Sequence, residues 1–126
     1  MQIGQVAERT GLSLRTIRHY EEMGLVSPSA RSKGGFRLYT DADVDRLMVV
    51  RRMKPLDFSL DEMRELLAIT DRLTAEDAGT EEQEQLREQL SGFHRIAEAR
   101  CEKLRAQLRS AEDFAATLRR RLDGEG

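Results

Sequence analysis

Apolar residues recur at helical spacing near the start of the chain, and glycines divide them into two short segments. The first segment carries Ile3, Val6 and Ala7. The second segment, 12–23, lies between Gly11 and Gly24. Apolar residues three or four apart share one face of a helix, and glycine readily adopts the left-handed backbone that ends one. The pattern therefore predicts a helix, a tight turn and a second helix.

The second of these helices has distinct apolar and polar faces. Ser13 is placed to cap its first turn, and Gly24 to end it. We expect Leu14 and Ile17, three residues apart, to face inward. The polar side chains that remain, and that face elsewhere, are Arg15, Thr16, Arg18 and His19.

The pattern changes to a two-residue alternation in segment 25–39. A polar run, 31–35, ends in Gly34 and Gly35 and is followed by the alternating residues 36–39. Alternation of apolar and polar residues after a glycine pair is typical of a β-hairpin with a tight tip. We therefore expect a small wing here.

Two further helices follow the wing. Thr40 or Asp41 caps the first of them, and Pro55 ends it because proline has no backbone N–H to continue the hydrogen-bond ladder. Ser59 opens a capping box that starts the next helix, which we expect to extend to about residue 73.

The last third of the chain predicts one long helix. Thr80 and Gln83 form a capping box, and no proline interrupts the highly charged sequence from there to Leu122, so about forty residues can form a helix roughly 60 Å long. Two series of residues repeat every seven positions, as in a coiled-coil seam. The first series is Leu90, Ala97, Leu104, Ala111 and Leu118, and the second is His94, Cys101, Leu108, Ala115 and Leu122.

The charges of this helix predict the direction in which two copies pair. Glu81, Glu82 and Glu84 stand at its start, and 119–121 are three arginines at its end. Antiparallel pairing brings these opposite charges together and centres the two-fold axis near Cys101.

The elements together predict a mainly α fold. A winged helix-turn-helix head with a small β-hairpin wing is followed by a long C-terminal dimerisation helix that forms an antiparallel coiled coil. We expect a head at 1–73, a linker at 74–80, the coiled-coil helix at 81–122 and a short tail at 123–126.

Charge is distributed unevenly along the 126 residues, although the net charge is only −2. Residues 1–54 contain ten Lys and Arg against six Asp and Glu, whereas the remainder is acidic. Clustered positive charge attracts phosphate, so the head is a candidate for binding nucleic acid. No apolar stretch is long enough to span a bilayer and no signal peptide is visible, so we expect a cytoplasmic protein without a membrane partner.

These features resemble the MerR family of bacterial transcriptional regulators. The resemblance rests on the order of the elements, on Thr-Ile-Arg-His-Tyr-Glu-Glu-Met-Gly-Leu at 16–25 and on Gly-Phe-Arg-Leu-Tyr at 35–39, and it covers roughly residues 1 to 70. The segment 53–63 looks like the family's second helix pair, with Asp57 where glycine is commonest. That substitution restricts the loop without abolishing the fold.

The resemblance implies a homodimer that binds double-stranded promoter DNA and acts with RNA polymerase. Each recognition helix enters a major groove, each wing lies on the adjacent backbone, and the promoter is bent and untwisted. The expected DNA contacts are Arg15, Thr16, Arg18, His19 and Tyr20 on the helix, and Arg31, Lys33, Gly35, Arg37 and Tyr39 on the wing. Tyr20 and Tyr39 are equally well explained as core aromatics, and for Phe36 a core position is favoured.

The expected dimerisation residues are those of the seam, and Cys101 among them raises a question of redox chemistry. They are Leu90, Ala97, Cys101, Leu104, Leu108, Ala111, Leu118 and Leu122. If Cys101 faces its mate across the axis, oxidation could join the chains and change the angle between the heads. A small apolar filler is the favoured interpretation.

We predict neither a cofactor nor a metal. Metal-sensing relatives carry several cysteines at the start of the dimer helix and in a loop after it, whereas Thr80 and Glu81 stand at that start here. A site built from His94 and Cys101 is disfavoured because seam residues one heptad apart usually just pack. Drug-sensing relatives carry a ligand domain after the coil, where only 123–126 follow here, so that class is disfavoured too.

Two other functions explain less of the sequence. A small architectural or excisionase-like DNA-binding protein would account for the head but not for the coil. A coiled-coil adaptor that binds protein would account for the acidic second half but not for the arginine- and glycine-containing wing. No Ser-His-Asp or Cys-His arrangement, phosphate-binding glycine loop or paired-carboxylate cleft is visible, so we predict that the protein is not an enzyme.

Overall fold

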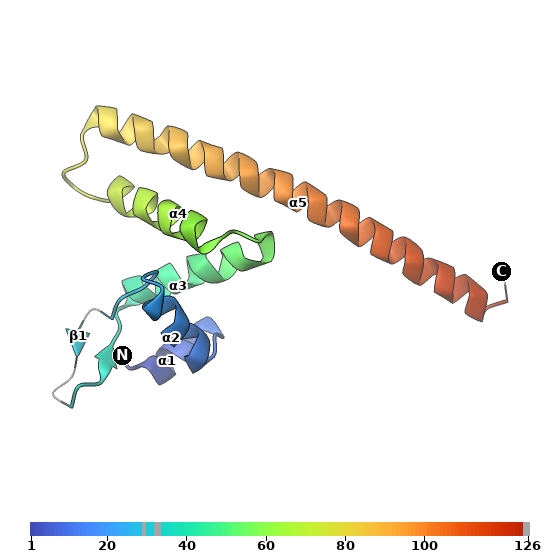
Figure 1. Cartoon of the computed structure of the whole chain (residues 1–126), viewed down its shortest axis with the longest axis horizontal. Coiled ribbons are helices and arrows are strands. Elements are labelled where there is room, and N and C mark those ends of the chain that lie inside the picture. Colours follow the sequence, from blue (N-terminus) through green and yellow to red (C-terminus); the bar gives the residue numbers. More distant parts are fainter. Residues whose placement is uncertain (29, 32–33, 125–126) are drawn as a thin grey trace. The chain divides into compact units, whose positions relative to one another are not determined.

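The computed structural model describes residues 1–28, 30–31 and 34–124 and confirms the mainly helical fold (Figure 1). The chain divides into two compact units, Met1–Leu90 and Ser91–Gly126. Its elements are α1 (Ile3–Thr10), α2 (Leu14–Glu22), β1 (Ala30–Arg31), β2 (Arg37–Leu38), α3 (Asp41–Met53), the 3-10 helix η1 (Lys54–Leu56), α4 (Leu60–Leu73) and α5 (Thr80–Leu122). We call the part of the first unit that ends with α4, residues 1–73, the head.

The predicted helix-turn-helix is formed by α1 and α2. Gly11, at φ +72°, ends α1, and the Ser13 hydroxyl accepts a hydrogen bond from the Thr16 amide at 3.1 Å, which caps α2. Gly24, at φ +77°, follows the last turn of α2, and the Leu25 amide bonds back to the Tyr20 carbonyl at 3.0 Å. A residue with a side chain would be strained at either glycine, so these two positions define the turn.

One expectation for α2 is wrong. Ile17 is fully buried as predicted, but the side chain of Leu14 is 42% exposed. Leu14 is the first residue of α2. Because Cα–Cβ bonds tilt toward the N-terminus of a helix, a side chain at that position points past the helix end. The buried stripe of α2 therefore starts at Ile17 and continues with Tyr20.

The predicted wing is a two-stranded antiparallel hairpin. Ala30 pairs with Leu38 and Arg31 with Arg37. The start of the chain adds an isolated bridge between Gln2 and Leu38. The N-terminal segment therefore lies against β2 and connects the wing to α1.

Capping side chains set the starts of α3 and α4. Thr40, rather than Asp41, caps α3, because its hydroxyl accepts a hydrogen bond from the Asp43 amide at 3.2 Å. Ser59 forms the predicted capping box of α4. Between these helices Asp57 has φ +59°, in the left-handed region. The position where the family commonly has glycine thus requires the backbone that glycine adopts most easily.

The hydrophobic core of the head contains buried residues from α1, α2, α3 and α4. Thr10 is buried among them, and its hydroxyl donates to the Val6 carbonyl at 2.8 Å. The buried apolar residues are Val6, Ile17, Tyr20, Leu25, Val26, Tyr39, Val44, Leu47, Val50, Met53, Phe58, Met63, Leu67 and Ile69.

Arginines from α3 and α4 bind carbonyl oxygens at the ends of α1 and α2. Arg51 donates to the Thr10 carbonyl at 2.8 Å, and Arg64 donates to the Met23 carbonyl at 2.6 and 3.0 Å. Arg46 donates to the Leu25 carbonyl at 2.6 Å and to both oxygens of Asp71 at 2.7 and 2.8 Å. The last carbonyls of a helix lack partners within it and carry partial negative charge, so these bonds fasten the helices together.

The predicted long helix is present as α5, which has 43 residues and is therefore about 65 Å long. The predicted capping box at its start is wrong by one residue. The Gln83 amide bonds to the Gly79 carbonyl at 2.9 Å, so Thr80 is already inside the helix. The Gln83 side chain donates instead to the Ala78 carbonyl at 3.2 Å.

An ion pair joins the first turn of α5 to the end of α4. Arg72 donates to the two carboxylate oxygens of Glu82 at 2.8 and 2.9 Å. The guanidinium holds the pKa of Glu82 below its usual range, chiefly through these hydrogen bonds. None of the helices in the described ranges combines the length and apolar character that crossing a bilayer requires.

Candidate nucleic-acid interface

One face of α2 presents basic side chains to solvent. Arg15, Arg18 and His19 are exposed, whereas Ile17 and Tyr20 on the other face are buried. Neither Arg15 nor Arg18 forms a hydrogen bond or ion pair with any residue that the structure describes. Both guanidinium groups therefore have their N–H donors available for a partner outside the head.

Thr16, the other polar residue predicted on this helix, is half-buried. Its hydroxyl oxygen accepts a hydrogen bond from the Ser13 hydroxyl at 2.8 Å. The hydrogen of the Thr16 hydroxyl stays available for donation to another group. The capping bond fixes the side chain, so any contact it makes is restricted to one direction.

Tyr20 corrects one of the predicted DNA contacts. Its side chain is 1% exposed, and the ammonium of Lys54 lies 5.8 Å from the centre of its ring. Its hydroxyl is buried and has no hydrogen-bond partner among the described residues. Tyr20 is a core aromatic in this structure, as the alternative interpretation held.

Tyr39 corrects a second predicted DNA contact. Its side chain is buried, and its hydroxyl donates to Glu21 at 2.8 Å. The pKa of Tyr39 is raised to about 12. Burial is the largest cause, and the hydrogen bond to the Glu21 carboxylate is the second. The phenol is therefore fixed inside the head, between the wing and α2.

Phe36 departs from expectation in the opposite direction. A core position was favoured, but the side chain is 61% exposed. Phe36 precedes β2, whose two residues are 37 and 38, and its ring lies close to the backbone of Gly34. Strands of two residues are too short to extend the core to the tip, so an aromatic residue at this position stays at the surface.

Three other wing residues, Gly35, Arg31 and Lys33, are also predicted to contact DNA. Gly35 is exposed and has φ +80°, which suits the tip of a hairpin. The backbone of Arg31 pairs with that of Arg37 in the hairpin. Lys33 lies outside the described residues.

Arg37 contacts α2 through Glu21, a residue that the sequence analysis did not single out. The Arg37 Nε donates to Glu21 at 2.8 Å, and the Glu21 side chain is 16% exposed. Glu21 therefore accepts hydrogen bonds from both Arg37 and Tyr39 and joins the wing to the recognition helix. The only signal in the sequence was the position of Glu21 within the 16–25 motif, next to the equally acidic Glu22.

The fold brings part of the predicted site together in one surface pocket, which we call the junction pocket. Arg18 contributes from α2 and Arg37 from the wing. The residues that line the pocket are Gln2, Ile3, Arg18, Gly35, Phe36 and Arg37. Arg15, Thr16 and His19 do not line it and lie elsewhere on α2.

The predicted seam residues of α5 leave apolar side chains exposed within one chain. No residue of α5 is buried, and Leu104, Leu108, Leu118 and Leu122 are between 42% and 83% exposed. Phe114 is also exposed, although it belongs to neither heptad series. An apolar surface of this kind on a long helix indicates that another protein surface covers it.

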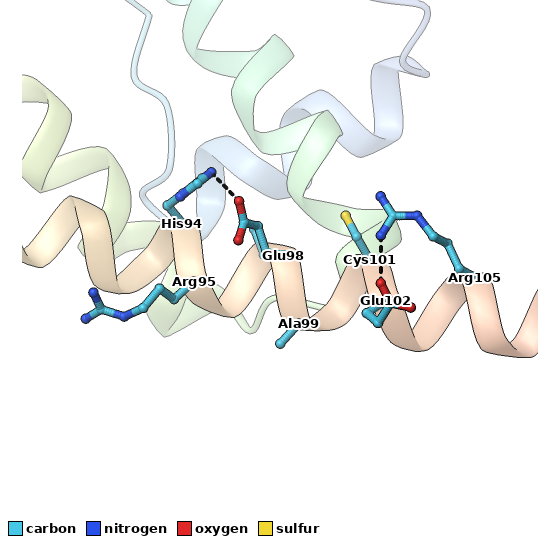
Figure 2. Close-up of a pocket in the computed structure, with 8 residues that line it drawn as sticks. His94, Arg95, Glu98, Ala99, Cys101, Glu102 and Arg105 are labelled. Carbon is cyan, nitrogen blue, oxygen red and sulfur yellow. Dashed lines mark hydrogen bonds and ion pairs between the residues drawn. The ribbon is translucent and has the colours of Figure 1, made fainter.

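Cys101 and His94 leave α5 on the same side, opposite Arg95 and Ala99, in the close-up of the helix surface (Figure 2). His94 pairs with Glu98, with 3.1 Å between Nε2 and Oε1. Cys101 is half-buried and reduced. No group of three or more His, Cys, Asp or Glu residues in the described part of the chain is placed to hold a metal ion.

Comparison with protein families identifies the chain. The family model for the MerR HTH family of regulatory proteins matches residues 1–69, and the model described as MerR, DNA binding matches residues 44–121. The chain belongs to the MerR HTH family of regulatory proteins. The resemblance inferred from segments 16–25 and 35–39 is therefore confirmed.

Individual relatives from this family cover the chain to different extents. The HTH-type transcriptional activator mta of Bacillus subtilis is 47% identical over 66 residues, which are 52% of this chain and 26% of mta. The HTH-type transcriptional activator TipA of Streptomyces coelicolor is 37% identical over 110 residues, which are 87% of this chain and 39% of TipA. The chain thus spans well under two thirds of either relative.

A solved structure extends the likeness across both units of the chain. It is the N-terminal part of the Bacillus subtilis multidrug transporter activator, MtaN, with 30% identity and a TM-score of 0.56. The match covers 97% of this chain and 97% of that one. Both units therefore have counterparts in the structure of that activator fragment.

Proposed function

We propose that the protein is a dimeric transcriptional regulator that binds a two-fold promoter site and bends and untwists it in response to a signal. The observation that carries the proposal is the pair of unpaired arginines on the exposed face of α2. Arg15 and Arg18 stand three residues apart on the second helix of a helix-turn-helix, where a recognition helix reads a major groove.

The contrast with the other arginines of the head strengthens this argument. Arg46, Arg51 and Arg64 bind backbone carbonyls, and Arg9 pairs with Asp41 at 2.6 Å. Those side chains serve the fold. Arg15 and Arg18 have no such role. Unlike Arg52, which is also exposed, they lie together on the second helix of the helix-turn-helix, and this position favours binding to DNA.

The exposed seam of α5 supports the dimer. Burying a leucine side chain contributes about 2 kcal/mol, and Leu104, Leu108, Leu118 and Leu122 have no cover within one chain. A second copy in antiparallel orientation would cover them and place acidic starts beside basic ends. The expected domains, with a head at 1–73, a linker at 74–80 and a dimerisation helix at 81–122, fit this arrangement.

The dimer favours a regulator over an architectural DNA-binding protein. A rigid helix pair between two heads fixes their separation, and a fixed separation is needed to bend a promoter toward the spacing that RNA polymerase requires. Action on promoter DNA with RNA polymerase places the protein in the cytoplasm. We propose no enzymatic activity, because the named relatives are transcriptional activators.

The test is a footprint on the DNA upstream of the protein's own gene, at a salt concentration that suppresses non-specific binding. We expect protection of a two-fold site between the promoter elements, with enhanced cleavage at its centre where the DNA bends. Arg15→Ala should weaken protection about fivefold or more, since a bidentate contact to a base is worth about 1–3 kcal/mol. Arg52→Ala removes the same charge from an exposed position on α3 and should leave the footprint unchanged.

A random-sequence selection completes the test if that upstream region is not protected. Enrichment of a two-fold sequence would support the proposal and supply the operator. No enrichment, together with equal weak binding by the wild type and Arg15→Ala, would contradict it.

A further inference from the structure

We propose that Arg18 and Arg37 bind the same backbone phosphate in the junction pocket, and that Glu21 is the positioning residue that aims Arg37 at it. The inference rests on the proposed binding of DNA and assigns a specific task to the junction between the recognition helix and the wing. A phosphodiester is the ligand, and the two arginines approach it from different elements.

The pocket itself is the first observation. Arg18 comes from the middle of α2 and Arg37 from the first position of β2, yet both line one depression at the surface of the head. Gly35 lines it without a side chain, so a bulky ligand can approach the backbone there. Phe36 adds an exposed ring beside the pocket, where the sugar next to a phosphate can pack.

The contacts of Arg37 are the second observation. A guanidinium carries five N–H donors in one plane. Arg37 uses its Nε for Glu21, and its bond to that carboxylate at 2.8 Å fixes the plane of the group. The terminal nitrogens remain at the end of a side chain whose rotation is already restricted. Less conformational entropy is therefore lost when they bind a ligand.

Glu21 is itself held firmly. Its side chain is 16% exposed and also accepts the Tyr39 hydroxyl at 2.8 Å. A carboxylate with two donors in a mostly buried position has few alternative conformations, so it is a fixed support for Arg37. This arrangement differs from a surface ion pair, whose long side chains move freely.

The charge balance and the geometry point to phosphate rather than a base edge. Arg18 and Arg37 supply two positive charges and Glu21 one negative charge, which leaves one positive charge for one phosphodiester. A base edge is read by a single planar fork lying in the plane of the base. A phosphate is tetrahedral and accepts donors from several directions, so two guanidinium groups from separate elements suit it better.

A scan of neutral phosphates on the selected operator tests the proposal. Each phosphate is replaced in turn by a methylphosphonate, which removes the charge and keeps the shape. Wild-type protein should lose about tenfold in affinity at one phosphate of each half-site, because hydrogen bonds between charged groups are worth 1.5–3 kcal/mol. Arg18→Ala and Arg37→Ala should each bind the native operator more weakly and show less than about a twofold further loss at that same phosphate.

The positioning role of Glu21 has a matched control in its neighbour. Glu21→Gln should lose affinity for the native operator but bind the operator with that one methylphosphonate as well as wild type does. Glu22→Gln makes the same change of charge at an exposed side chain and should match wild type on both DNAs. Thermal unfolding followed by circular dichroism checks that each variant is folded, and Arg18→Ala carries the test if Glu21→Gln is not.

Two results would overturn the proposal, and a third would refute the proposed function on which it rests. Arg18→Ala and Arg37→Ala could remove sensitivity at two different phosphates, which would mean separate contacts. Glu21→Gln could weaken binding to both DNAs equally, which would mean a purely structural role. Wild-type protein that selects no DNA would instead refute the proposed function, and that outcome is distinct from the other two.

Discussion

The head and the last unit of the chain, Ser91–Gly126, are both built from helices but depend on different partners. The head buries apolar residues from α1 to α4 in one core. Within the last unit no residue of α5 is buried, and leucines lie exposed along one seam. The comparison teaches that the head can fold on its own contacts, whereas the long helix needs a second surface to cover it.

The use of arginine separates the two units in the same way. In the head, Arg51 and Arg64 each contact a carbonyl 41 residues away in the sequence. In the last unit, Arg105 pairs with Glu102 and Arg119 with Asp123, three and four residues away. Exposed pairs at this spacing stabilise a helix by only a few tenths of a kcal/mol. Long-range arginine hydrogen bonds therefore stabilise the tertiary structure of the head, whereas the local ion pairs of the last unit contribute little to stability.

The largest effect should come from a charge in the seam. Leu104→Asp places two carboxylates close to the two-fold axis, and burying them unpaired costs several kcal/mol. We expect light scattering to show a monomer at micromolar concentration. The chain has two tyrosines and no tryptophan, and both tyrosines are buried in the head, so tyrosine fluorescence reports the head alone and should not change.

Gln107→Asp is the control for this variant, because it adds the same charge at an exposed position outside the two heptad series. It should remain a dimer. A dimeric Leu104→Asp variant would show that the seam is wrongly assigned.

Loss of Arg46 should affect the head and spare the dimer. Arg46→Ala leaves the Leu25 carbonyl and the Asp71 carboxylate without their donors. We expect urea unfolding followed by tyrosine fluorescence to show about 2 kcal/mol less stability. Arg52→Ala, which removes an exposed arginine from the same helix, should change it little. Equal stability of the two variants would refute the structural role of Arg46.

The two buried tyrosines offer a matched pair within the head. Tyr39→Phe removes a hydrogen bond to Glu21, and we expect a loss of about 1 kcal/mol. Tyr20→Phe removes a buried hydroxyl that has no partner among the described residues, so stability should stay the same or rise. Denaturation followed by circular dichroism distinguishes the two, and similar losses in both variants would contradict the assignment.

The raised pKa of Tyr39 predicts how stability depends on pH. The pKa of Tyr39 is raised to about 12 from an ordinary value of 10.0, so the unfolded chain releases this proton first. The stabilisation is therefore complete below pH 10 and disappears as the pH rises toward 12. At pH 11 wild type should have lost about 1 kcal/mol that Tyr39→Phe does not lose. Parallel curves for the two proteins would contradict the raised pKa.

The smallest effect should come from the loop between α3 and α4. Asp57 has φ +59°, and an L-residue in the left-handed region is strained, although Asp tolerates it better than most. Asp57→Gly should relieve that strain and stabilise the head by about 0.5 kcal/mol, after the entropy cost of glycine is subtracted. A thermal unfolding midpoint below that of wild type would show that the Asp57 side chain contributes more than its backbone costs.

Sequence predicted the elements well because their ends are set locally. Ser13, Thr40 and Ser59 each cap a helix through an amide three residues ahead, so the signal and its effect lie within one turn. Leu14 and Phe36 were misplaced because helical and strand periodicity assign a face without saying where the covering layer ends. Leu14 is the first residue of α2, and Phe36 immediately precedes β2.

The candidate site was harder to predict because it depends on long-range partners. Nothing local distinguishes Arg18, which stays unpaired, from Arg64, which binds a carbonyl 41 residues away. Glu21 and Glu22 are adjacent and chemically identical, yet only Glu21 meets Arg37, 16 residues later. Such roles follow from tertiary contacts, which no single pattern in the chain encodes.

The arginines fastened to carbonyl oxygens also affect how binding responds to salt. A protein displaces condensed cations from a duplex in proportion to the phosphates it neutralises, and the logarithm of affinity falls by about 0.9 per phosphate for each unit of the logarithm of salt concentration. Arg46 and Arg51 donate inside the head and displace none of these cations. The ten basic residues of segment 1–54 therefore overstate the number of cations released, and each head should respond to salt as a less basic surface than its composition suggests.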